Sequence, residues 1–136
     1  MHFTRPLTIA AFLLAACAGA AVAAPNEKLT GMPLVPGSTA VSPALIETKM
    51  AMCDYKIGTK SYNISNVGST SAPAFFAKSI PGAKKFPYSA GGVDGIAMFA
   101  ANGSAMVHIE PGLLIYYKFE PNIPAGRYSA VAKGGC

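Results

Sequence analysis

The sequence predicts an all-β fold, a small antiparallel β-sandwich of about six to eight short strands. Three observations lead to this prediction. Glycine and proline occur 14 and 11 times in 136 residues, and they divide the chain with turn signals at short intervals. Between these signals apolar residues recur with period two. No period of 3.6 residues persists beyond the first two dozen residues, so we expect no helix in the mature domain.

The N-terminus has the pattern of a secretory signal over residues 1–23. Arg5 provides a positive start, and the apolar run at 7–16 is too short to span a bilayer as a helix. Ala-Val-Ala at 21–23 is a small-x-small cleavage pattern, so we expect a secreted or periplasmic chain that begins at Ala24. The alternative is a lipid anchor on Cys17, because Leu-Ala-Ala-Cys at this point resembles the bacterial lipobox.

Two cysteines remain after the signal, Cys53 and Cys136. In an exported chain such a pair is expected to form a disulfide. The bond would close a long loop around most of the domain, which the chain-entropy model values at roughly 4–5 kcal/mol. No Cys-x-x-Cys spacing points to redox chemistry, so we expect a structural disulfide.

The mature chain divides into a leader and a domain. Residues 24–44 are rich in proline and glycine and predict an extended leader, with an edge strand near its end. The domain follows over 45–136. Its first expected hairpin has Gly58-Thr59 as a type II′ turn between strands at 48–57 and 60–66, which places Cys53 on the apolar face.

The second hairpin is expected at Asn102-Gly103, a type I′ turn signal. The pairing that follows puts Ile96 opposite Ile109 and Met98 opposite Val107 on one apolar face. His108 falls on the other, mixed face of this hairpin.

The remaining strands are predicted from the turn signals that flank them. Pro111-Gly112 predicts a turn before a strand at 113–119, whose alternate side chains are apolar. Further strands are expected at 74–80 and 127–133, and 84–95 is the longest irregular stretch.

Two segments resemble bacterial immunoglobulin-like modules of the CARDB type. The first is a strand followed by the turn Asn66-Val67-Gly68 and by a strand that begins near Ala74 and Phe75. The second is Pro111-Gly112, the strand 113–119, and then Ala-Gly-Arg-Tyr at 125–128. The resemblance implies an immunoglobulin-like sandwich that binds or adheres and does not catalyse.

The composition and the motifs favour binding over catalysis. The formal charge of +5 is modest, which favours an anionic envelope surface as a partner and does not predict nucleic-acid binding. His108 is the one histidine after the signal, and no nucleophile motif accompanies it. We therefore expect no enzyme activity, no cofactor and no transmembrane span.

One set of residues has the chemistry of a copper site. Met50 and Met52 share one strand face, as do Met106 and His108, and thioether and imidazole ligands suit Cu(I). The alternative is that the methionines fill a second layer of packing while His108 lies at a sheet surface.

The sequence thus predicts an exported, non-catalytic binding module whose partner is a protein or an envelope glycan or lipid surface. The alternative is a secreted inhibitor or effector that presents the stretch 84–95 to a target protein. Asn63 and Asn102 both match the N-glycosylation pattern, and we expect either to be accessible in a eukaryotic host.

Overall fold

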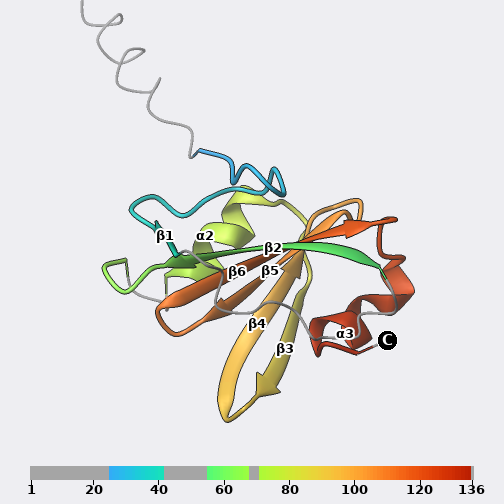
Figure 1. The fold of residues 1–136 in the computed structure, drawn as a ribbon. Coiled ribbons are helices and arrows are strands. Elements are labelled where there is room, and N and C mark those ends of the chain that lie inside the picture. The colour runs from blue at the N-terminus through green and yellow to red at the C-terminus, as the bar shows by residue number, and fades with distance from the viewer. Residues whose placement is uncertain (1–24, 42–54, 68–70, 136) are drawn as a thin grey trace, which may run out of the picture.

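The alternating segments of the chain form one six-stranded antiparallel sheet. The structure, a computed structural model, describes residues 25–41, 55–67 and 71–135 (Figure 1). In chain order the strands are β1 Thr39–Val41, β2 Lys56–Asn63, β3 Lys85–Ala90, β4 Val93–Phe99, β5 Ala105–Glu110 and β6 Leu113–Glu120. Across the sheet they run β1-β2-β6-β5-β4-β3. The prediction of a mainly β fold is confirmed, and among the described residues all strands belong to this single sheet.

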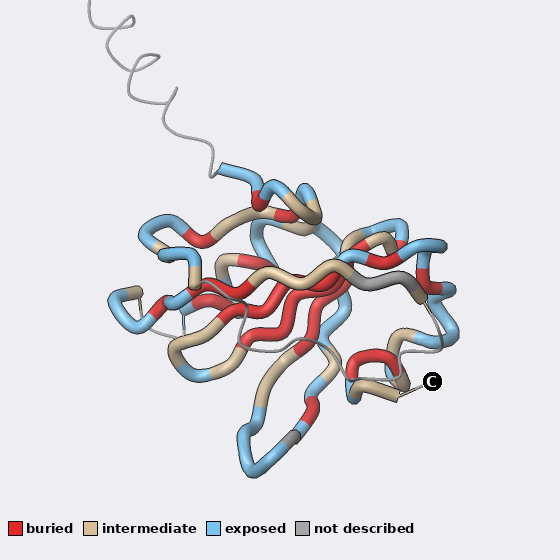
Figure 2. The backbone as a smooth tube through the Cα atoms, in the orientation of Figure 1, coloured by how far each residue is buried: buried red, intermediate tan, exposed pale blue. Residues whose placement is uncertain are grey.

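Helices pack on both faces of the sheet, where a sandwich would have a second sheet. Helix α2, Ala72–Ser79, buries Phe76 against one face, together with Met32 and Val35 of the N-terminal segment. Helix α3, Tyr128–Ala132, follows the 3₁₀ turn η2, Ala125–Arg127, and packs on the opposite face. We call these faces the α2 face and the α3 face. Figure 2 shows the buried centre of the sheet between them.

The strand predicted at 74–80 is wrong, because this segment is helix α2. Its sequence, Ala-Pro-Ala-Phe-Phe-Ala-Lys-Ser, has proline in the first turn, alanines along its length and a lysine in the last turn, all of which favour a helix. Ala72 and Phe76, four residues apart, form its buried stripe. The segment from Ala74, in which the CARDB-type resemblance implies a strand, is therefore part of a helix in this chain.

The strand predicted at 127–133 is also wrong, since its centre is helix α3. Only five residues are helical, too few to show a period. Val131 and Ala132 are buried against the α3 face, so tertiary packing stabilises this short helix.

The first predicted hairpin is not present, because β2 runs straight through Gly58-Thr59. Gly58 pairs with Lys118 in the middle of an eight-residue ladder with β6. A Cβ at Gly58 would lie 3.1 Å from Leu29 Cδ1, so the missing side chain leaves room for the N-terminal segment. Here glycine permits a close approach of two segments and does not mark a turn.

The second predicted hairpin is confirmed in its register. Ile96 pairs with Ile109, and Met98 with Val107, and these residues pack on the α2 face. The turn differs in detail, since Gly103 N–H donates to Ala100 O and the loop is longer than two residues. The turn Pro111-Gly112 and the apolar side of β6 are found as predicted.

Candidate functional site

The stretch 84–95, predicted to be irregular, is mostly a hairpin that projects from the sheet. Gly91 and Gly92 have φ values of 59° and 81°, so they form the two-residue loop with positive φ that type I′ turns require. Pairing of β3 with β4 extends to Ala90 and Val93, whereas pairing of β4 with β5 begins only at Ile96. The tip of the hairpin therefore has no neighbour in β5, and it stands away from the sheet in Figure 1.

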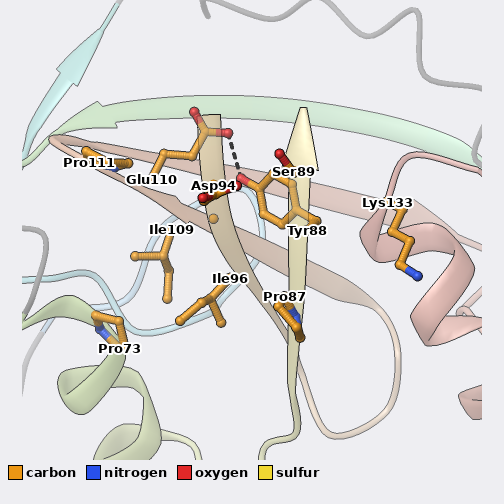
Figure 3. Close-up of a pocket in the computed structure, with 11 residues that line it drawn as sticks. Pro73, Pro87, Tyr88, Ser89, Asp94, Ile96, Ile109, Glu110, Pro111 and Lys133 are labelled. Carbon is orange, nitrogen blue, oxygen red and sulfur yellow. Dashed lines mark hydrogen bonds between the residues drawn. The ribbon is translucent and has the colours of Figure 1, made fainter. Parts of the chain in front are cut away.

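A tyrosine connects the projecting hairpin to the sheet. Tyr88 pairs with Gly95 across the hairpin, and a Cβ at Gly95 would lie 2.5 Å from the Tyr88 ring. The bare glycine thus lets the ring lie across β4 and reach β5. There the Tyr88 hydroxyl donates a 2.6 Å hydrogen bond to Glu110 Oε2, drawn as a dashed line in Figure 3.

The same ring packs on His108. The two ring centroids are 4.2 Å apart in a stacked arrangement, and Tyr117 meets His108 edge-on at 4.9 Å. His108 also bonds to the backbone of Ala132 in helix α3. Its Nε2 has no hydrogen-bond partner among the described residues, so we assign the proton to Nδ1, which donates to the Ala132 carbonyl.

A hollow with a volume of about 760 Å³ lies between the hairpin and its neighbours, and we call it the hairpin hollow. Its lining is Pro73, Pro87, Tyr88, Ser89, Asp94, Gly95, Ile96, Ile109, Glu110, Pro111 and Lys133. Figure 3 shows the labelled side chains coming from α2, the β3–β4 hairpin, β5, the β5–β6 turn and the residue that follows α3. Apolar walls with a few polar groups are typical of small-molecule and peptide sites.

Burial sets the protonation of the groups beside the hollow. Burial, reinforced by the hydrogen bond to Glu110, raises the pKa of Tyr88 far above its ordinary value, so Tyr88 remains a hydrogen-bond donor. Burial lowers the pKa of His108 to about 4, against a smaller opposing effect of the bond to Ala132. His108 is therefore neutral at pH 7, and only 1% of its surface is exposed. It supports the position of Tyr88 by packing.

The predicted copper residues are only partly placed by the structure. Met106 and His108 both lie on the α3 face, as the register predicted, but the expectation of a mixed, partly exposed face is wrong because both are buried. Met50 and Met52 lie outside the described residues. Within the described part of the chain no group of three or more His, Cys, Asp or Glu residues could hold a metal ion.

The other predicted sites fall in different places. Cys17, Cys53 and Cys136 lie outside the described residues, so the disulfide and the lipid anchor stay predictions. Asn63 and Asn102 are both exposed, and the side-chain oxygen of each accepts hydrogen bonds from the serine two residues later.

Sequence reasoning named the stretch 84–95 as a segment that an inhibitor or effector would present, but it did not single out Tyr88, Gly95 or Glu110, which build the hairpin hollow. One signal was available. A turn centred on Gly91-Gly92 would have paired Tyr88 with Gly95 directly, and Gly-Gly between apolar segments is a recognised hairpin signal.

The fold and the site define a class: a small antiparallel sheet with helices on both faces, from which one hairpin projects beside an apolar hollow. No family model, curated protein or solved structure matches this chain. Among the described residues, no helix has the length and apolar character needed to cross a membrane.

Proposed function

We propose that this chain is an exported, non-catalytic binding protein that engages a protein or an envelope surface through the β3–β4 hairpin and the hairpin hollow. The observation that carries the proposal is the position of the hairpin. It extends past the end of the β4–β5 ladder and presents its residues next to a hollow of about 760 Å³. Secretion, the structural disulfide and the absence of catalysis are parts of this proposal.

The faces of the sheet offer less to a partner than the hairpin does. Helix α2 and the N-terminal segment pack on one face, and helix α3 packs on the other. A binding module that used an open sheet face would need one of these layers to be absent. The hairpin instead favours the mode expected of an inhibitor or effector, in which one protruding segment meets the target.

The edge strand β3 also favours a partner that contacts side chains rather than one that pairs with the backbone of the sheet. Pro87 lies in the middle of this edge strand, where it lacks the N–H that an added strand would use. Proline at such a position opposes edge-to-edge pairing. We therefore propose that the partner contacts side chains of the hairpin tip and the hollow, such as Ser89 and Val93, and does not extend the sheet.

Two matched variants test this proposal. Ser89→Arg places a long charged side chain at the hollow, and Thr39→Arg makes the same kind of change on β1, the opposite edge of the sheet; both residues are exposed. Immobilised mature protein is offered the envelope and secreted fractions of the source cells, and the bound components are quantified. We expect components that are retained by the wild type and by Thr39→Arg but lost with Ser89→Arg. Equal retention by all three proteins would contradict the proposal.

A further inference from the structure

A second hollow lies at the other end of β3, away from the projecting tip. It has a volume of about 440 Å³ and opens where the loop from α2 to β3 faces η2 and the start of α3. We call it the aromatic hollow. Its lining is Ile80, Pro81, Gly82, Ala83, Lys84, Phe86, Phe99, Ala100, Ala101, Ala125, Gly126, Tyr128 and Ser129. The volume falls within the range of about 300–1,000 Å³ that small-molecule sites occupy.

Three aromatic rings give this hollow a preformed apolar wall. Phe99 and Tyr128 stack with centroids 4.1 Å apart and an interplanar angle of 8°. Phe86 stands edge-on to both, at 5.7 Å from Phe99 and 6.1 Å from Tyr128. Because each ring is held by the other two, an apolar ligand would meet a surface that needs little ordering on binding.

The charge on the described lining of the aromatic hollow is positive. Among the described residues that line it, Lys84 is the only ionised one, and its side chain is exposed. The carboxylates of the described chain lie elsewhere: Glu27 is buried beside Thr30 and Tyr62, Asp94 and Glu110 line the hairpin hollow, and Glu120 ends β6. The whole chain carries a formal charge of +5, which adds to the local attraction for an anion.

We propose that the aromatic hollow binds a small amphipathic monoanion, a carboxylate or sulfonate with an apolar body. The body lies against Phe86 and Tyr128, and the anionic group pairs with Lys84. The hairpin hollow is less suited to this ligand because two carboxylates line it. This proposal is independent of the proposed function, since the residues it uses are not those that line the hairpin hollow.

The test compares two fluorescent probes that differ by one charged group. 1-Anilinonaphthalene-8-sulfonate has the required anion, whereas N-phenyl-1-naphthylamine has the same ring skeleton without it. We expect the full mature chain to bind the sulfonate about two- to fivefold more tightly than the neutral probe, the size of effect that one ionic contact with an exposed lysine gives. Decanoate, an aliphatic carboxylate, should displace the sulfonate.

Three variants locate the site and its charge. Lys84→Glu should remove the preference for the sulfonate while binding of the neutral probe continues, and Lys118→Glu, an exposed lysine on β6 outside the hollow's lining, is the control for net charge. Gly126→Leu should block both probes. Gly126 lines the hollow, its φ is not in the left-handed region, and a Cβ there meets no atom within 4 Å, so the protein should still fold.

The outcomes are exclusive. Loss of the sulfonate preference in Lys84→Glu but not in Lys118→Glu, with both probes blocked by Gly126→Leu at an unchanged melting temperature, supports the proposal. Equal binding of the two probes to the wild type would overturn it. So would a response of Lys118→Glu as large as that of Lys84→Glu, or undiminished binding to Gly126→Leu.

Discussion

The two faces of the sheet bury polar groups in different ways. On the α2 face, Glu27 is 1% exposed, and its carboxylate accepts hydrogen bonds from Leu29 N, Thr30 N, Thr30 Oγ1 and the Tyr62 hydroxyl at 2.7–3.0 Å. Tyr116 donates to the Pro33 carbonyl at 2.8 Å. On the α3 face, His108 Nε2 and Ser61 Oγ are buried, and no group in the described part of the chain forms a hydrogen bond with either.

The difference comes from the segments that cover the faces. The irregular segment 25–38 has backbone N–H and carbonyl groups that no helix or strand uses, so they can bond to Glu27 of the same segment and to Tyr116 of the sheet. The α3 face is covered by a short helix and aromatic rings, which offer packing but few hydrogen bonds. We therefore expect the α2 face to depend on its hydrogen bonds and the α3 face to depend on packing and on pH.

The largest expected effect comes from a substitution at Gly103, which lies against Ile123 of the α3 face. Gly103 has a φ of 75°, and a Cβ there would lie 2.1 Å from the Ile123 carbonyl oxygen. Gly103→Val should cost more than about 3 kcal/mol, because backbone strain and this clash add. Gly112→Val is the control: its φ is 73° and a Cβ would meet no atom of the described residues within 4 Å, so strain alone should cost about 1–2 kcal/mol. Equal costs in denaturant melts would contradict the role of Ile123.

The sequence predicted the centre of the sheet and missed its periphery. The β4–β5 register followed from centring the hairpin on Asn102-Gly103, and it is correct although the turn itself is longer than two residues. The turns were harder to assign because the glycines have different roles. Gly58 allows close packing of Leu29, Gly103 allows close approach of the Ile123 carbonyl, and Gly91-Gly92 forms the tight turn of the β3–β4 hairpin. The type of residue is the same in each case, and only the neighbours distinguish the roles.

The candidate site could be predicted less well, because it depends on contacts distant in sequence. Tyr88 and Glu110 are 22 residues apart and meet only after β3, β4 and β5 have paired. Helices α2 and α3 are short, and the sequence alone does not show that they will pack on the faces of a sheet. The facing of His108 followed from the register, but its burial depended on α3.

The next largest effect is a loss of stability at acidic pH. The pKa of His108 is about 4 in the folded protein against an ordinary 6.5, so the unfolded chain binds its proton first as the pH falls. Stability is unaffected above pH 6.5 and decreases between 6.5 and 4 by about 3 kcal/mol from this group. His108→Phe, which keeps an aromatic ring but does not titrate, should lose correspondingly less over that range. Urea melts at pH 7 and pH 4 measure both losses, and parallel losses would contradict the assignment.

The same burial changes the expectation for truncation of this side chain. A surface His108 would make His108→Ala nearly neutral. The stacked contact with Tyr88 and the edge contact with Tyr117 instead predict a cost of about 2 kcal/mol at pH 7, as expected for an underfilled core. A melting temperature equal to the wild type would show that the α3 face tolerates the cavity.

A comparable test on the α2 face removes the carboxylate of Glu27. Glu27→Ala leaves four donors without their acceptor and should cost about 2 kcal/mol. Glu27→Gln should be destabilising as well, because its amide nitrogen would face N–H or O–H donors on either side. Unchanged stability in either variant would mean that water replaces these bonds and that the segment 25–38 contributes little to the fold.

The smallest expected effect compares two variants, each of which removes one serine hydroxyl, from the α3 face and from the segment that covers the α2 face. Ser61 Oγ is buried on the α3 face and has no partner in the segments that the structure describes, so Ser61→Ala removes a polar group that makes no hydrogen bond there. We expect no loss of stability and up to about 1 kcal/mol of gain. Ser38 Oγ, in the segment of the α2 face, donates to the Val35 carbonyl at 2.7 Å. Ser38→Ala should therefore cost about 0.5–1 kcal/mol. Paired urea melts at one pH decide the matter: a loss for Ser61→Ala as large as that for Ser38→Ala would show that both faces satisfy their polar groups equally.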